Sequence, residues 1–201
     1  MELRDYQDQI VTENLTAMAA GCKSTLNGLF TGAGKTVIFV SMAARILGRT
    51  LIICPMRELV WQAVEKVRDI TAEDPAIEMA DFHAEGDDWW SPKIVVASKQ
   101  TLLSRRKGEP RYKKFTDFSL VIVDEAHLMC SAPVIEMFQF FQANGAMVAG
   151  FTATPFRMDG KAMMRETCTS TSDSSEDSIS NGQSITDGQC PPFASSRESI
   201  H

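Results

Sequence analysis

The chain lacks several features that would place it in a class at once. Its 5 cysteines are odd in number, widely spaced and without a C-x-x-C pair, so the sequence indicates neither a zinc site nor a disulfide framework. No stretch reaches the roughly 18 apolar residues that a membrane helix needs, and the first residues are charged and lack the apolar core of a secretory signal. We therefore expect a reducing, cytoplasmic location and no membrane partner.

The chain also lacks an excess of positive charge. The formal net charge is −6 and the pI is about 5.1, which argues against a protein that holds nucleic acid by a bulk positive field, although a local basic face remains open. What the chain does have is a hydrophobic content of 44% in 201 residues, enough for one domain with a buried core.

Short apolar runs alternate with amphipathic stretches over the first 150 residues. They predict helices over 5–20, 35–47, 57–70 and 132–143, and strands over 24–30, 51–54, 93–97, 120–123 and 147–151. This alternation is typical of an open parallel α/β sheet with right-handed crossovers. A polar cluster follows each predicted strand, and function in such folds lies at the carboxyl ends of the strands.

The composition changes near residue 165. From there to residue 201 the chain is rich in Ser, Thr and acidic residues and has almost no apolar periodicity, so we predict a disordered tail after a folded region of residues 1–164. The tail is either an acidic linker, which could in principle be phosphorylated, or a disordered terminus without a function of its own. We prefer the second interpretation.

A glycine-rich turn precedes the second predicted helix. In Thr31-Gly32-Ala33-Gly34-Lys35-Thr36, backbone N–H groups and the helix N-terminus can surround phosphate, Lys35 can reach the outer phosphates, and the Thr36 hydroxyl can bind Mg²⁺. The strict P-loop pattern puts glycine at position 29, where this chain has Leu29. Gly32 and Gly34 nevertheless retain the geometry that phosphate binding needs, so this turn is the predicted phosphate site.

An acidic pair, Asp124-Glu125, closes the strand predicted over 120–123. Such a pair is common at helix starts, where it only stabilises the helix dipole. At the end of a buried strand, however, an unpaired carboxylate is costly, so a cation is the natural partner of Asp124. Together with the glycine-rich turn, the pair predicts a site for Mg-ATP.

Six segments in order resemble the first motor domain of superfamily 2 helicases and translocases, of the restriction-subunit and DNA-repair type. The segments are Leu3–Gln7, Thr31–Thr36, Pro55–Leu59, Val96–Leu102, Asp124–His127 and Thr152–Arg157. The resemblance implies a P-loop NTPase with a three-layer RecA-like α/β fold, ATP and Mg²⁺ as cofactors, and nucleic acid, DNA more than RNA, as partner.

The resemblance also implies a role for individual residues near the nucleotide. Asp124 would hold the metal, and Glu125 would polarise the attacking water. His127 would link the γ-phosphate to the strand end at Thr152 and Thr154, and so couple hydrolysis to movement. Arg4, Tyr6 and Gln7 would recognise adenine, and the Gln7 amide suits this role because it offers one donor and one acceptor. Spacing alone leaves Gln7 as an exposed residue at a helix start.

For nucleic acid the candidates are Arg57 and the polar residues Ser98, Gln100 and Thr101, which could bind phosphates without sequence preference. Alternatively, Arg57 pairs with Glu58 or caps a helix. The basic run 105–107 is more easily explained as solvated surface than as a backbone contact. Likewise, Trp89-Trp90 is better explained as a hydrophobic plug than as a base-stacking site.

In the family that the chain resembles, a second domain supplies an arginine to the γ-phosphate, worth several orders of magnitude in rate. Nothing after Met164 resembles such a domain, so we expect truncation, or completion in trans by a second motor domain. Three hypotheses follow: a motor domain of a larger machine, a nucleotide-binding module with negligible turnover, or a nonfunctional remnant. We expect the isolated chain to bind ATP weakly and to hydrolyse little of it.

Overall fold

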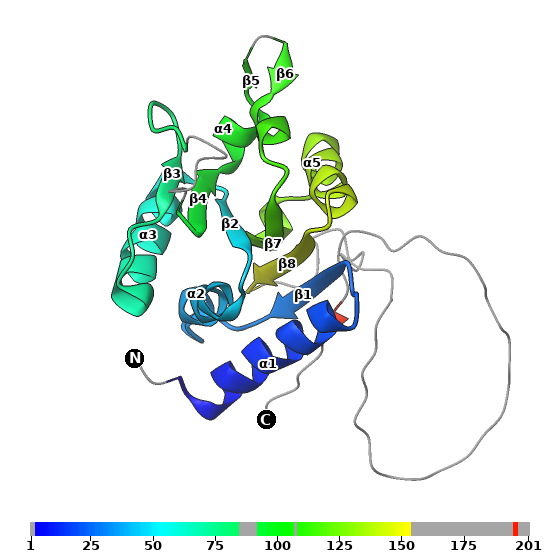
Figure 1. Ribbon diagram of the computed structural model, residues 1–201. Coiled ribbons are helices and arrows are strands. Elements are labelled where there is room, and N and C mark those ends of the chain that lie inside the picture. The colour runs from blue at the N-terminus through cyan, green and yellow to red at the C-terminus, as the bar shows by residue number, and fades with distance from the viewer. Residues whose placement is uncertain (1–2, 85–91, 107, 154–194, 197–201) are drawn as a thin grey trace, which may run out of the picture.

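The computed structural model describes residues 3–84, 92–106, 108–153 and 195–196, which form a parallel sheet covered by helices (Figure 1). The strand order is β3-β4-β2-β7-β8-β1-β9, and every neighbouring pair is parallel. The strands are β1 (Ser24–Gly28), β2 (Arg49–Cys54), β3 (Ala76–Glu78), β4 (Ile94–Ser98), β7 (Phe118–Val123), β8 (Met147–Thr152) and β9 (Ser195–Ser196). A separate antiparallel hairpin joins β5 (Arg105–Arg106) to β6 (Glu109–Pro110).

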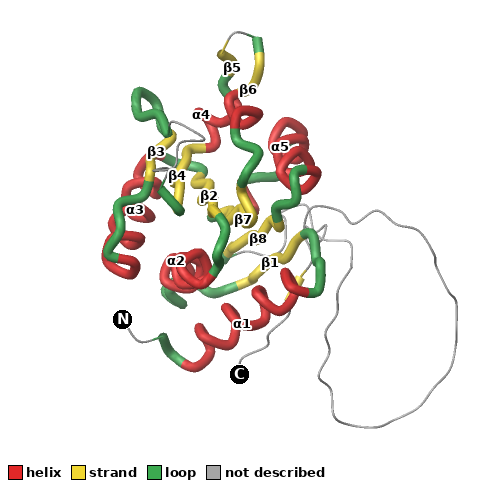
Figure 2. The backbone as a smooth tube through the Cα atoms, viewed as in Figure 1, coloured by secondary structure: helices red, strands yellow, loops and turns green. Residues whose placement is uncertain are grey.

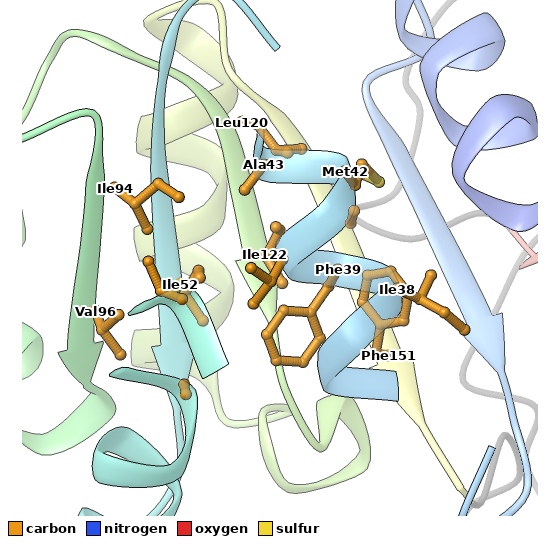
Figure 3. Packing of buried hydrophobic residues seen from close by; sticks show 14 of the residues in the cluster. Ile38, Phe39, Met42, Ala43, Ile52, Ile94, Val96, Leu120, Ile122 and Phe151 are labelled. Atoms are coloured by element: carbon orange, nitrogen blue, oxygen red, sulfur yellow. The ribbon is translucent and has the colours of Figure 1, made fainter. Parts of the chain in front are cut away.

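Helices cover both faces of this sheet, as Figure 2 shows in red. They are α1 (Asp5–Ala19), α2 (Lys35–Arg45), α3 (Arg57–Thr71), α4 (Lys99–Leu103) and α5 (Ala132–Ala143), with 3-10 turns η1 (Arg111–Lys114) and η2 (Ala126–Leu128). Side chains alternate along β2, so Ile52 packs with α1, α2 and α3, and Leu51 and Ile53 pack with α4, η1 and α5. Figure 3 shows the first of these cores, where Phe39 of α2 lies near Ile122 and Phe151. The predicted three-layer α/β fold is confirmed.

The order of the central strands determines where the two predicted motifs meet. Strand β8 lies between β7 and β1, with Val148 level with both Ser24 and Val121. The chain leaves β1 for the phosphate loop and leaves β7 for the acidic pair, so the two motifs are two strand spacings apart, about 10 Å. A long side chain is therefore needed to connect them.

Most predicted elements are confirmed, and the differences are local. Helix α2 ends at Arg45 and not at residue 47, because Ile46 is extended and Leu47 is fully exposed. Strand β1 ends at Gly28 and not at Phe30. The sequence patterns missed β3 and the β5–β6 hairpin, whose strands are only two or three residues long.

Two residues of the predicted tail are among the described residues. Ser195 and Ser196 form β9, which pairs with Leu26 and Asn27 at the edge of the sheet. Backbone hydrogen bonds to an open sheet edge require no apolar pattern, so nothing in the sequence indicated this strand. The rest of the predicted tail, Thr154 and Trp89-Trp90 lie outside the described residues. Among the described helices, none is long and apolar enough to cross a membrane.

Candidate nucleotide-binding site

The phosphate loop runs from the end of β1 to the first residue of α2, Lys35. Gly32 and Gly34 have φ angles of 89° and 76°, a left-handed conformation that residues with a Cβ rarely adopt. Gly34 is the N-cap of α2, so the first amide groups of the helix have no partner within the helix. This loop therefore has the backbone geometry that binds anions.

The start of α1 holds the loop from the side. The Tyr6 hydroxyl donates to the carbonyl oxygen of Ala33 at 2.9 Å, and the Gln7 side-chain amide donates to the same oxygen at 3.1 Å. The Gln7 carbonyl oxygen accepts from the backbone N–H of Arg4 at 3.1 Å. Gln7 is thus buried and contacts the phosphate loop in this structure, and its contact with adenine, like that of Arg4, stays a prediction.

Gly34 also lies close to the Gln7 side chain. A Cβ built at this position would lie 2.7 Å from the Gln7 amide nitrogen, closer than real Cβ contacts. Any side chain here would disturb the hydrogen bond that connects α1 to the loop. The glycine therefore serves both the left-handed turn and the close approach of Gln7.

Asp124 and Glu125 follow β7 directly. The Asp124 N–H donates to the Ile53 carbonyl at 3.0 Å and so extends the pairing with β2 by one residue. The Asp124 carboxylate accepts from the Glu125 N–H at 3.0 Å. Glu125 has a φ of 47°, a conformation that is strained for a residue other than glycine and that is concentrated at functional sites.

Burial, followed by the neighbouring charge of Glu125, raises the pKa of Asp124 from 3.8 to about 6. The Glu125 N–H and Lys35 act in the opposite direction but do not offset it. Burial and the Asp124 charge also raise the pKa of the Cys54 thiol at the end of β2, well above its ordinary value. Asp124 is therefore a buried carboxylate that its surroundings leave short of positive charge.

Lys35 connects the two motifs. Its ammonium nitrogen lies 3.5 Å from a carboxylate oxygen of Glu125, and both side chains are partly buried. The lysine expected to bind phosphate and the glutamate expected to act on water thus face the same space. This is the arrangement on which the prediction of a nucleotide site depended.

His127 joins the acidic pair to the end of β8. Its Nδ1 lies 2.9 Å from the Thr152 hydroxyl and 3.3 Å from the second carboxylate oxygen of Glu125. A change at Glu125 can therefore reach β8 through one imidazole ring. The contact with Thr152 has the geometry expected for coupling, but the coupling itself stays a prediction.

Comparison with known proteins identifies the family of this chain. Residues 1–157 match the model of a family described as "Type III restriction enzyme, res subunit", which covers most of the chain. The chain belongs to the superfamily 2 helicases and translocases.

Its curated relatives in this superfamily are longer proteins. IRC3 of Saccharomyces cerevisiae, provisionally named an ATP-dependent helicase, is 30% identical over 80% of this chain and 24% of its own length. The DNA 3'-5' translocase XPB2 of Sulfurisphaera tokodaii is 32% identical over 80% of this chain and 33% of its own length. The superfamily 2 domain described here thus spans about a quarter to a third of these relatives.

Solved structures agree on the fold. The UvsW helicase of bacteriophage T4 superposes with a TM-score of 0.59 at 22% identity, over 77% of this chain and 54% of that one. The helicase domain of Hef from Pyrococcus furiosus has a TM-score of 0.58 at 27% identity, over 76% and 33%. These matches show the RecA-like α/β fold for this chain.

The candidate nucleic-acid residues of this superfamily 2 domain have structural partners as well. Ser98 caps α4 by accepting from the Thr101 N–H, and the Thr101 hydroxyl accepts from the Ala80 N–H at 3.1 Å. The Gln100 amide donates to the Pro55 carbonyl at 2.8 Å. Arg57 is exposed at the start of α3 and forms no ion pair with Glu58 among the described residues. These bonds hold the loops after β2, β3 and β4 together at one edge.

Sequence patterns missed two groups that support the site. Asn14 and Asn27 are buried and bonded to each other between α1 and β1, and Glu78 is fully buried at the end of β3. Neither group belongs to a motif. Periodicity could have shown that Asn14 lies on the buried face of α1, but it could not show that Asn27 faces it.

Proposed function

We propose that the chain is the ATP-binding motor domain of a superfamily 2 DNA helicase or translocase, which couples Mg-ATP hydrolysis to movement along nucleic acid. The proposal rests chiefly on the 3.5 Å distance between the Lys35 ammonium and the Glu125 carboxylate. That distance brings a phosphate-binding lysine and a candidate base for water to one side of the sheet, as γ-phosphoryl transfer requires.

The residues at this site fit magnesium. Mg²⁺ binds oxygen ligands and usually takes one or two carboxylates together with substrate phosphates and water. Buried Asp124 would supply such a carboxylate and Thr36 a hydroxyl, and a cation beside Asp124 would offset the burial that raises its pKa. When bound, the metal would neutralise charge on the β- and γ-phosphates. Lys35 would bind the γ-phosphate, and Glu125 would orient water.

His127 would transmit the state of the γ-phosphate to β8 through its contact with Thr152. DNA is the preferred partner because XPB2 is named a DNA translocase. A structural neighbour, the SWI2/SNF2 ATPase core of Sulfolobus solfataricus, is described in complex with dsDNA, and its 19% identity supports the fold alone. A second motor domain would contribute the arginine that completes the site.

Two substitutions in the full chain test the assigned roles. Lys35→Ala should weaken binding of a fluorescent, non-hydrolysable ATP analogue by more than about tenfold, because it removes a charge-assisted phosphate contact. Glu125→Gln should change that affinity by less than about threefold while reducing ATP turnover by about a hundredfold or more, the usual contribution of an acid–base group.

Lys23→Ala, at an exposed lysine just before β1, is the matched control and should leave both quantities unchanged. Equal loss of analogue binding in Lys35→Ala and Glu125→Gln would contradict the separate roles. Unchanged binding in Lys35→Ala would remove the proposal altogether.

The second candidate is a nucleotide-binding module with negligible turnover, because the described site has the phosphate loop and the acidic pair, whereas the arginine that speeds γ-phosphoryl transfer would come from a second domain. ATPase measurements on the isolated chain, with and without single-stranded and duplex DNA, separate the two. Stimulated turnover supports the motor, whereas analogue binding with background turnover supports the module.

A further inference from the structure

The β5–β6 hairpin concentrates positive charge in an acidic protein. Residues 105–114 contain six basic residues and one acidic residue, although the whole chain has a net charge of −6. Its first part forms the projecting hairpin, in which Arg105 pairs with Pro110 and Arg106 with Glu109, and residues 111–114 form η1 behind it. Figure 1 shows the hairpin extending from the end of α4, away from the sheet.

Part of this charge is already neutralised. Arg111 and Lys114 both pair with buried Glu78, and Lys113 pairs with Glu109 at 2.7 Å. Of the other three basic residues, Lys107 lies outside the described residues, and Arg105 and Arg106 are exposed and form no ion pair within 4.0 Å in the described part of the chain. The Arg105 guanidinium donates to the Gly108 carbonyl at 3.4 Å, within the hairpin itself.

The two arginines occupy opposite faces of the ribbon, because successive strand residues alternate. Arg105 lines a hollow of about 410 Å³ between the hairpin and α5, where Glu109 and Glu136 are also found. Arg106 lies on the other face. The hairpin can therefore present one guanidinium on each side to an extended anion.

Hydrogen bonds fix the base of the hairpin. The Arg111 N–H donates to the Ser104 carbonyl at 2.9 Å and closes its base, and Lys114 also donates to the Ala84 carbonyl at 2.9 Å. Glu78 thus connects the residues after the hairpin to the edge strand β3. A fixed projection loses little conformational freedom on binding, which favours affinity.

Its position extends the predicted nucleic-acid edge. Helix α4 begins at the Ser98–Thr101 cluster, next to η2, where the Lys99 ammonium donates to the Leu128 carbonyl at 3.2 Å. The five residues of α4 then lead to the hairpin, a rise of about 7 Å. This distance matches roughly two nucleotide steps of about 3.4 Å along one strand.

We propose that the β5–β6 hairpin is an additional sequence-independent contact for the phosphodiester backbone of nucleic acid, made by Arg105 and Arg106. The inference builds on the proposed motor function, but it concerns a different surface from the nucleotide site. Guanidinium groups suit this ligand because they donate two parallel hydrogen bonds to phosphate oxygens.

The test compares two double variants of the full chain that each remove two positive charges. Arg105→Gln/Arg106→Gln changes the hairpin, and Lys23→Gln/Arg68→Gln changes exposed residues before β1 and in the last turn of α3. Fluorescence anisotropy would measure binding of single-stranded DNA, duplex DNA and single-stranded RNA across a salt series. Analogue binding would verify that each variant keeps its nucleotide site.

We expect the hairpin variant to bind single-stranded probe about tenfold more weakly at low salt, and its plot of log affinity against log salt to be shallower by about 1.4, since each lost phosphate contact removes about 0.7. The control should change affinity by less than twofold. A similar loss with all three probes assigns the contact to the shared backbone.

The proposal is overturned if both double variants lose affinity equally, if the slope stays constant, or if the wild-type chain binds none of the probes in a salt-dependent way. These outcomes do not decide the nucleotide site. That site fails only if Lys35→Ala keeps its analogue affinity, so the two proposals fail separately.

Discussion

Asp124 shows at the scale of one residue how a binding site is built at the expense of stability. Its carboxylate is buried, lies beside Glu125 and has a pKa of about 6. Because the folded pKa lies above the unfolded value, the protonated form is favoured by folding. The contribution of the Asp124 carboxyl to the free energy of unfolding is therefore fully present below about pH 3.8. It is lost as the pH rises through about 6.

Asp124→Asn should therefore stabilise the nucleotide-free chain at pH 7.5, by at most about 3 kcal/mol, and have little effect near pH 4. Thermal or urea denaturation at the two pH values would measure the difference. Asp81→Asn, at an exposed aspartate, is the control. A destabilised Asp124→Asn protein at pH 7.5 would show that the carboxylate has a favourable partner in the folded chain.

At the scale of an element, α1 is attached to the sheet by a buried polar network. The Asn14 amide donates to the Ile10 carbonyl and to Asn27 on β1, both at 2.8 Å, and the Asn14 oxygen accepts from Thr25 at 2.6 Å. Asn27 in turn donates to the Gly150 carbonyl on β8 at 3.2 Å. Since Tyr6 and Gln7 start the same helix, this network also positions the residues that hold the phosphate loop.

Asn14→Ala should lower the free energy of unfolding by about 2–3 kcal/mol, because Asn27 and Thr25 would lose partners in a buried setting. The matched control is Thr12→Ala, an exposed position on the same helix, which should change stability by less than about 0.5 kcal/mol. Urea denaturation measures both. Equal stability of the two variants would mean that water satisfies the network after truncation.

At the scale of the whole molecule, buried Glu78 connects the edge of the sheet to the face that carries α5. It accepts from the Ala84 N–H and from Lys114, both at 2.9 Å, and pairs with Arg111 of η1. Segments 79–84 and 111–114, distant in sequence, therefore meet at one carboxylate. Glu78 therefore positions the hairpin and the loop after β3 (residues 79–84) relative to each other.

Glu78→Gln should destabilise the fold by about 3 kcal/mol, because it breaks a buried ion-pair network and leaves the partly buried Arg111 without its carboxylate. Glu109→Gln makes the same change in an exposed pair with Lys113, and its melting temperature should stay close to that of the wild type. Differential scanning fluorimetry measures both. A Glu78→Gln variant as stable as Glu109→Gln would show that the buried pair contributes no net stability.

Predictability from sequence differed with the length of the pattern involved. The apolar run Leu120–Val123 and the long helix α3 were predictable, because their periodicity extends over several residues. Strand β3 and the hairpin were not, since two or three residues carry no period. Among the site residues, Lys35 and Glu125 were found through motifs, but the Gln7–Ala33 contact joins positions 26 apart in the chain and needed the fold.

The amino-acid sequence by itself determined the α/β class, the glycines of the phosphate loop and the residue types that binding a nucleotide requires, because these depend on local conformation and side-chain chemistry. Only the tertiary structure decided that Lys35 reaches across β8 to Glu125, that His127 meets Thr152, and that Glu78 pairs with Arg111. The order of the strands and the crossover connections between them set these distances. Both depend on packing between segments that are far apart in the sequence, which no local pattern relates.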